Sequence, residues 1–241
     1  MKKLMIGAAI SLAMVGGASA ADLPAYRPVP AYLPPAWSWT GCYVGANVGI
    51  GWGRNDVVDV TTVPAFDTGV DAGTGVVGGG QIGCDYQAGN WVFGAQTMFD
   101  WSGIRGSHPY IGGASSPAET LGTNTPWFGT LTGRIGYTAT PQALLYLKGG
   151  AAWVHNRYTD MDPTVPFWNA LEATRLGWTV GGGAEYSFQP NWSLFVEYAY
   201  YDFGNFNATL NGSGTPYTYN EKQTMQTVLF GLNFRFGGPR Y

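Results

Sequence analysis

Apolar and polar side chains alternate with a period of two along eight segments of the chain. Successive side chains of a β-strand point to opposite sides, so each segment predicts a strand with one apolar and one polar face. Residues 227–236 illustrate the pattern, with Leu229 as the one apolar member of the polar face. The eight segments are residues 41–52, 74–87, 90–104, 126–139, 142–158, 174–189, 191–206 and 222–236.

The connections between these segments alternate in length. Residues 87–90, 139–142 and 189–191 are tight turns rich in Gly, Pro and Asn, which turns require. Long polar stretches separate the other segments: residues 53–73, 106–125, 159–173 and 207–221. Short turns at one end and long loops at the other are typical of bacterial outer-membrane barrels. A soluble lipocalin-like barrel also has eight strands, so loop length alone leaves both folds open.

The two faces of the predicted strands distinguish the membrane barrel from the soluble one. Only 11% of the residues are charged, and the apolar face of all eight segments carries no charge. A charge facing lipid at the bilayer midplane costs about 2–4 kcal/mol, which explains this exclusion. Strand charges fall on the opposite face: Asp85, Asp100, Arg134, Lys148, Glu185, Glu197 and Arg235. The apolar face is therefore predicted to meet lipid, and the charged face to line the lumen.

Aromatic residues gather at both ends of the predicted strands, as they do at the two membrane–water boundaries of outer-membrane barrels. The ring at the long-loop end contains Trp52, Trp101, Trp127, Trp153 and Trp178. The ring at the turn end contains Tyr86, Trp91, Tyr137, Phe188, Trp192 and Phe236. We predict an all-β fold, an eight-stranded antiparallel up-and-down transmembrane β-barrel with long extracellular loops and short periplasmic turns. An even strand number lets the first and last strands pair, which leaves no open edge in lipid.

The first 36 residues are predicted to lie outside the barrel. Lys2 and Lys3, an apolar stretch and a small-residue site between Ala20 and Ala21 make residues 1–20 a secretory signal peptide. Residues 21–36 contain five prolines and are predicted to be a periplasmic linker, which leaves residues 37–241 for the barrel. Without the leader, 10 basic residues face 15 acidic ones, a net charge of −5, which argues against nucleic acid as a partner.

Three motifs carry a resemblance to a known family: residues 39–45 (WTGCYVG), 79–86 (GGQIGCDY) and 229–236 (LFGLNFRF). With the leader and the linker, they resemble the small outer-membrane immunogenic proteins, a porin family of the rhizobial alpha-proteobacteria that is related to OmpA-type barrels. The resemblance implies a surface-exposed barrel in the Gram-negative outer membrane, without catalysis. Many such barrels end at an aromatic residue that the barrel-assembly machinery reads, and here Phe236 and Tyr241 are both candidates.

The lumen charges are the main candidates for a mechanism. An eight-stranded barrel is just wide enough for side chains to fill it, so paired charges would link its walls and plug the lumen. The alternatives are a narrow pore with a ring of selective charges and a catalytic pair formed by Glu185 and Glu197. The sequence favours the plug.

The two cysteines are predicted to form a disulfide. A hairpin that pairs Trp52 with Thr74 puts Cys42 opposite Cys84, and the periplasm permits oxidation. The alternative is a pair of reduced side chains in the lipid-facing band.

Catalysis and cofactor binding have little support in the sequence. His108 and His155 show no nucleophile at a meaningful spacing, and two histidines do not make a metal site. We therefore predict no enzyme activity, metal or cofactor.

We predict a surface-exposed protein with a structural role in the envelope and an antigenic role. A small diffusion channel for ions or solutes is the alternative. The expected partners are outer-membrane lipid and lipopolysaccharide, together with the assembly machinery, and the sequence is compatible with a monomer.

Overall fold

The computed structural model describes residues 37–59, 66–109, 120–162, 167–211 and 216–236. The predicted signal peptide, its cleavage site at Ala20 and Ala21, the linker and Tyr241 lie outside these ranges. Among the described residues, no helix is long and apolar enough to cross a membrane.

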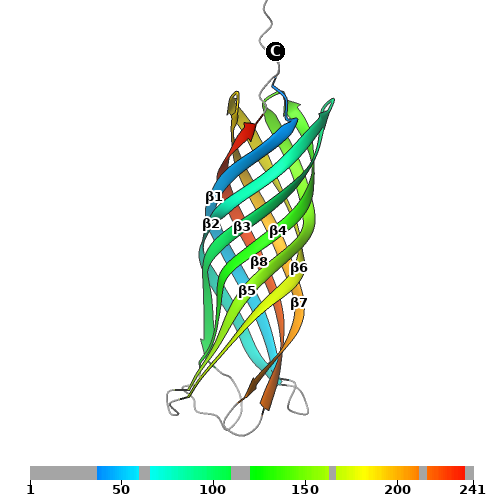
Figure 1. Cartoon of the computed structure of the whole chain (residues 1–241). Coiled ribbons are helices and arrows are strands. Elements are labelled where there is room, and N and C mark those ends of the chain that lie inside the picture. The colour runs from blue at the N-terminus through cyan, green and yellow to red at the C-terminus, as the bar shows by residue number, and fades with distance from the viewer. Residues whose placement is uncertain (1–36, 60–65, 110–119, 163–166, 212–215, 237–241) are drawn as a thin grey trace, which may run out of the picture. The chain divides into compact units, whose positions relative to one another are not determined.

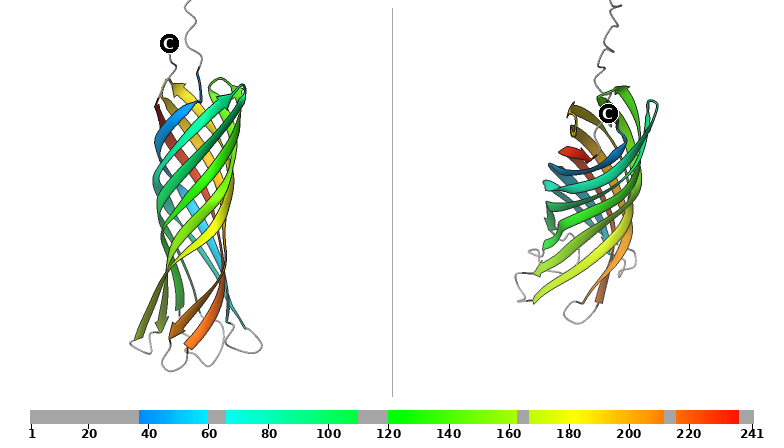
Figure 2. Two further views of the ribbon diagram at one scale, coloured as in Figure 1. Left: turned by 45° about the vertical axis from the view of Figure 1, so that its right-hand side comes forward. Right: turned by 45° about the horizontal axis from the view of Figure 1, so that its top comes forward.

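Eight antiparallel strands form a closed barrel in chain order, with β1 also paired to β8 (Figures 1 and 2). This confirms the predicted fold. The strands are β1 (Gly41–Asp59), β2 (Phe66–Ala88), β3 (Trp91–Pro109), β4 (Thr120–Thr140), β5 (Ala143–Asp162), β6 (Phe167–Gln189), β7 (Trp192–Asn211) and β8 (Pro216–Phe236).

The tight turns are where the sequence predicts them, at the top of Figure 1. In the first of these turns Gly89 has a φ of 61°, a conformation that glycine adopts without steric cost. Here we call this the turn end of the barrel, and the opposite end the long-loop end.

The strands run further toward the long-loop end than the alternation predicts. They are 19–23 residues long, whereas about 9–11 residues suffice to span a membrane. Much of each predicted loop is therefore strand: β1 continues to Asp59 and β2 begins at Phe66. Backbone pairing needs no apolar side chain, so the wall continues beyond the lipid where polar residues replace apolar ones.

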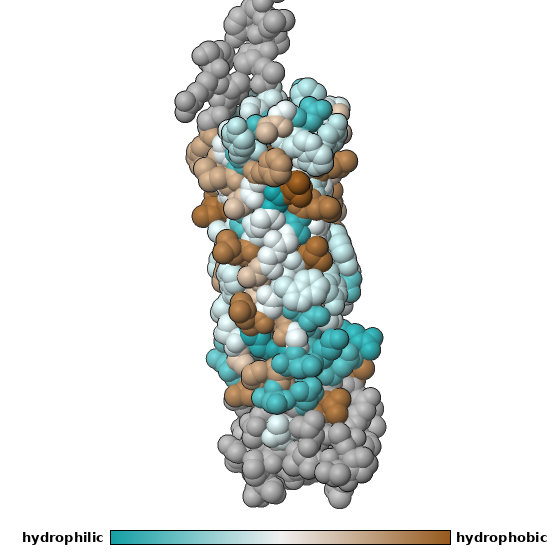
Figure 3. All heavy atoms as spheres, turned by 90° about the vertical axis from the view of Figure 1, so that its right-hand side faces the viewer, coloured by the Kyte–Doolittle hydropathy of each residue, from teal (hydrophilic) through white to brown (hydrophobic). Residues whose placement is uncertain are grey.

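The outward faces agree with the sequence. The large apolar residues assigned to lipid point outward, from Val48 (58% exposed) and Leu147 (66%) to Phe230 (58%). Figure 3 shows apolar residues along the middle of the wall and hydrophilic residues gathering toward the long-loop end. The exterior is thus apolar over the height that lipid covers.

Candidate functional site

Asp85, Arg134, Glu185 and Arg235 meet inside the barrel near the turn end. Asp85 in β2 accepts hydrogen bonds from Arg134 in β4 and, over 2.8 Å, from Arg235 in β8. Arg134 also donates to Glu185 in β6 over 3.1 Å. All four side chains are almost fully buried. Because none of these contacts joins neighbouring strands, the network links walls across the lumen.

Neutral groups add further contacts to this network. Ser193 and Asn233 donate to the same oxygen of Glu185 over 2.6 and 2.9 Å. Both arginines lie over the ring of Tyr43, at 4.8 and 4.9 Å from its centroid. Buried charges are tolerated when they are paired and hydrogen-bonded in this way. Gly94 makes room for Asp85, because a Cβ at this position would lie 2.0 Å from a carboxylate oxygen.

A second buried ion pair joins β5 to β7. The Nζ atom of Lys148 lies 2.6 Å from a carboxylate oxygen of Glu197 and donates to Gln96 over 3.2 Å. Tyr146 donates to the other oxygen of Glu197 over 2.9 Å. Asp100 is buried too and interacts electrostatically with Lys148 and Glu197. The structure thus places all seven predicted charges in the lumen, and among described residues every one except Asp100 has an ion-pair partner within 4.0 Å.

Trp39, which precedes β1, fills the lumen at the turn end. Its side chain is fully buried, and its indole N–H donates to the carbonyl of Pro141 over 3.2 Å. Its backbone N–H donates to Gln87 over 2.8 Å, and its carbonyl accepts from Arg235 over 2.6 Å. The apolar residues packed with it are Trp37, Val92, Leu144 and Tyr146. The sequence assigned the segment before the first strand no such role.

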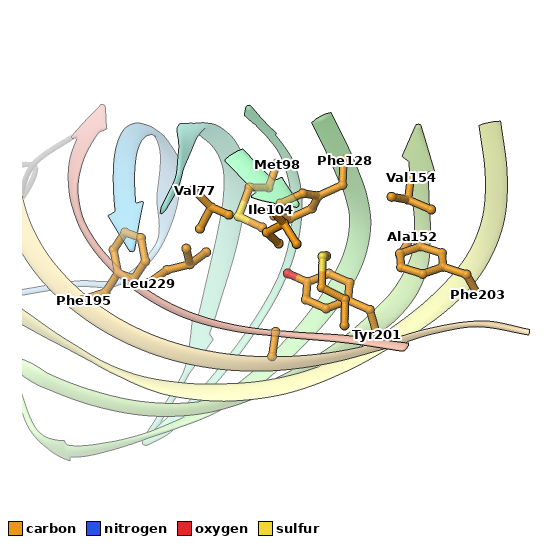
Figure 4. Packing of buried hydrophobic residues seen from close by; sticks show 12 residues of the cluster. Val77, Met98, Ile104, Phe128, Ala152, Val154, Phe195, Tyr201, Phe203 and Leu229 are labelled. Carbon is orange, nitrogen blue, oxygen red and sulfur yellow. The ribbon is translucent and has the colours of Figure 1, made fainter. Parts of the chain in front are cut away.

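An apolar layer crosses the lumen mostly on the long-loop side of the Asp85 network, with Asp100 and Glu197 at its level, although the sequence predicted a polar interior. In β4 the chain passes from Arg134 to Phe128, and in β8 from Arg235 to Leu229. Phe128 packs edge-on against Tyr201 of β7, with ring centroids 5.5 Å apart. The layer, most of which Figure 4 labels, comprises Val77, Met98, Ile104, Phe128, Ala152, Val154, Phe195, Ala199, Tyr201, Phe203, Met225 and Leu229.

A third layer of buried polar side chains lies beyond the apolar one, at the long-loop ends of the predicted strands and at Glu221 in a predicted loop. Arg175 donates to the carbonyl of Gly204 over 2.7 Å and lies 3.9 Å from Glu221. Asn156 donates to Gln223 over 2.7 Å. Gly204 sits at a bulge of β7 with a φ of 64°, and the bulge reverses which residues of β7 face inward. Asn156, Arg175 and Gln223 keep the parity of the lumen charges in their own strands, so period-two counting along β5, β6 and β8 would have found them.

Glu221 in this third layer has a raised pKa. It is 3% exposed and pairs with Val57, five residues beyond Trp52 of the outer aromatic ring, so it lies outside the membrane-spanning part. Burial raises the pKa of Glu221 from 4.5 to about 7, with Arg175 and Tyr158 opposing the shift and Asp71 adding to it. A Glu221 exposed by opening of the long-loop end would release its proton near pH 4.5. Between pH 4.5 and about 7 the folded end therefore binds this proton more tightly than the opened end does.

We expect the long-loop end to lose stability as pH rises from about 5 to 8. The free energy of opening this end falls by its full amount, on the order of 3 kcal/mol, once the pH is above the folded-state pKa of Glu221. Amide hydrogen exchange of β8 next to Glu221, compared with Glu221→Gln at each pH, measures it. The variant should remove the pH dependence, whereas Glu172→Gln, at an exposed site, should retain it. Equal pH dependence in wild type and Glu221→Gln would contradict the prediction.

Cys42 and Cys84 form a disulfide on the outward face of the barrel. The S–S distance is 2.09 Å, and the β1–β2 register pairs Cys42 with Cys84 and Trp52 with Thr74. Among the described residues no cysteine is free. The bond fastens the first hairpin near the turn end.

The remaining candidates are the two histidines and the pair formed by Glu185 and Glu197. His155 stacks on Trp127 at a centroid distance of 5.1 Å on the outward face, and the side chain of His108 is outside the described set. Glu185 and Glu197, the proposed catalytic pair, are both held by buried cations. No grouping of three or more His, Cys, Asp or Glu that could hold a metal occurs in the described part of the chain.

The family model of the outer membrane protein β-barrel domain matches residues 8–236. The chain belongs to this family. The 31 kDa outer-membrane immunogenic protein of Brucella melitensis is 35% identical to this family member over 97% of the chain and 100% of its own length. The 25 kDa outer-membrane immunogenic protein of Brucella abortus is 28% identical over 98% of the chain and 99% of its own length.

Solved structures of outer-membrane barrels share the fold. The outer membrane protease OmpT of Escherichia coli has a TM-score of 0.51 at 12% identity, covering 83% of this chain and 98% of its own. OprG of Pseudomonas aeruginosa has a TM-score of 0.50 at 13% identity, covering 82% and 97%. At such identities the likeness shows the fold alone. The family and the relatives indicate that this outer-membrane β-barrel protein is located in the outer membrane of a Gram-negative bacterium.

Proposed function

We propose that this protein is a closed, non-enzymatic barrel that serves the outer membrane as a structural and antigenic surface protein. The observation that carries the proposal is the apolar layer across the lumen. An ion that passes between Phe128 and Tyr201 would have to leave water for surroundings that are largely apolar, which is costly. The charged layer next to it is held by ion pairs, so its charges are neutralised rather than presented to a passing solute.

The antigenic part of the proposal rests on the relatives and on the strands. Two relatives that match nearly the whole chain are named outer-membrane immunogenic proteins. The strands carry polar residues beyond the outer aromatic ring, which supports a wall that extends above the lipid. Antibodies raised against the folded protein should bind intact cells, and binding only after lysis would contradict surface exposure. The closed wall needs no second copy, so we propose a monomer that relies on the assembly machinery for insertion.

Single-channel recording in planar bilayers tests the closed lumen. We expect the refolded wild-type protein to show no stable conductance of porin size, with a general porin in the same bilayers as positive control. The double substitution Phe128→Ala with Tyr201→Ala removes the two rings that meet across the lumen and should produce openings. Heat-modifiable mobility on a gel verifies that each sample is folded. A reproducible porin-sized conductance of the wild type would favour the diffusion-channel alternative.

A further inference from the structure

Two arginines flank an asparagine in one row on the outward face, at the long-loop end. Arg105 of β3 pairs with Asn124 of β4, and Asn124 pairs with Arg157 of β5. Directly opposed residues of antiparallel strands point to the same face, with Cβ atoms about 4.5–5.5 Å apart. A register shift in β4 around Pro126 turns Asn124 outward, although the alternation of the residues from Trp127 onward would place it in the lumen.

The next row toward the long-loop end has a glycine at its centre. Ser107 pairs with Gly122, and Gly122 pairs with Thr159, so two hydroxyl-bearing residues flank a position without a side chain. A Cβ at Gly122 would lie 3.0 Å from the hydroxyl of Thr159. Around this position the wall forms a groove of about 480 Å³, lined by Ala72, Arg105, Gly106, Ser107, Gly122, Thr123, Asn124 and Thr159.

The groove offers hydrogen-bond donors and positive charge. Arginine presents five N–H groups in a fork that fits phosphate and carboxylate oxygens, and the hydroxyl and amide groups can donate as well. Among the described residues, no carboxylate lies within 4.0 Å of the Arg105 guanidinium, which is exposed. Arg157 at the rim is bound to Glu172 over 2.8 Å, so Arg105 is the free cation of the pair.

The position of the groove relative to the membrane indicates which kind of anion it meets. On the same three strands, Trp101, Trp127 and Trp153 belong to the outer aromatic ring, and the arginine row lies three or four residues beyond them. Aromatic girdles sit at the membrane–water interface. The groove therefore opens sideways, just above the apolar band, where the headgroups of the outer leaflet lie.

We propose that this groove binds a phosphoryl group on the headgroup of an outer-leaflet lipid, with Arg105 as its main ligand. The phosphoryl oxygens accept from Arg105, Asn124 and Ser107 above the hollow at Gly122, while the acyl chains run down the apolar wall. The proposal is independent of whether the lumen conducts, so the two can fail separately.

Native mass spectrometry of the refolded full-length protein in detergent micelles tests the site. The probes are diphosphorylated lipid A, the same lipid without its phosphates, and inorganic phosphate. We expect one tightly retained diphosphorylated lipid A per barrel, and at least a tenfold loss of affinity in Arg105→Ala. Gly122→Val fills the hollow without changing the charge and should cause a similar loss. Heat-modifiable mobility confirms that each variant is folded.

Lys222→Ala is the matched control, because Lys222 is an exposed cation of β8, a strand that does not line the groove. It should bind the lipid like the wild type. Equal losses in Lys222→Ala and Arg105→Ala would reduce the binding to general charge attraction and overturn the proposal. Undiminished binding in Arg105→Ala, or of the dephosphorylated lipid, would overturn it as well. Competition by inorganic phosphate at lipid-like concentrations would assign the groove to soluble phosphate instead.

Discussion

Replacing Asp85 by alanine is expected to lower the free energy of unfolding by about 3–5 kcal/mol, because it leaves two buried arginines with one carboxylate, Glu185, between them. Asp85 is the acceptor that Arg134 and Arg235 share, and within the described part of the chain Arg235 has only Glu185, at 3.8 Å, as a further acidic partner. Urea titration of the protein refolded in lipid vesicles, followed by tryptophan fluorescence, measures the loss. The expected loss reflects the cost of burying poorly paired charges, and it does not measure the net contribution of the ion pairs to stability.

Asp56→Ala provides the control for this prediction. Asp56 also binds an arginine, Arg54, over 3.1 Å, but both side chains are substantially exposed. Exposed ion pairs contribute about 0–1 kcal/mol, so this variant should unfold almost like the wild type. Equal losses in the free energy of unfolding for Asp85→Ala and Asp56→Ala would contradict the prediction. The charge network at the turn end would then contribute no more than an exposed ion pair.

Replacing Trp39 by alanine is expected to cost a similar amount, about 3–5 kcal/mol, through a different mechanism. The change removes a fully buried ring from the cluster with Leu144 and Tyr146 and leaves the carbonyl of Pro141 without its indole donor. The same vesicle-based urea titration measures it. Trp39→Phe retains much of the ring packing and should lose clearly less, which keeps the prediction testable if the alanine variant fails to fold.

Ser38→Ala controls for changes in the segment that enters β1. Ser38 is exposed and accepts one local hydrogen bond, from the backbone N–H of Thr40 over 3.2 Å. Substitutions at such sites are usually within about 0.5 kcal/mol of the wild type. Wild-type stability of Trp39→Ala would show that the tryptophan does not seal the turn end of the lumen.

The outward face could be predicted from the sequence because lipid imposes a rule on each residue separately. A charge is excluded from every lipid-facing position, so the parity of residues such as Val48 and Leu147 follows from counting along each strand. The same counting placed the lumen charges inside. It also set the register between Cys42 and Cys84, because pairing Trp52 with Thr74 in the first hairpin relates two neighbouring strands without reference to the rest of the barrel.

The contacts inside the lumen could not be predicted in this way. Whether Arg134 reaches Asp85 or Glu185 depends on the tilt and stagger of strands that are not neighbours, which no local pattern encodes. The apolar layer was missed because residues such as Phe128 and Leu229 fall on the face that the charges mark as polar. The groove at Arg105 depends on the register shift in β4, and a single extra residue reverses the face of everything beyond it.

The pairing of β1 with β8 differs from the other strand pairs, because it joins the first strand of the chain to the last and so closes the wall. Seven strand pairs join chain neighbours, whereas the seam sets Cys42 opposite Phe236, at the two ends of the barrel sequence. A chain cut before β8 would expose the free edges of both β1 and β7 to lipid, where each unpaired backbone group costs several kcal/mol. Such a truncation removes one strand but forfeits closure, so the barrel tolerates loss of its last strand far less than an open sheet in water would.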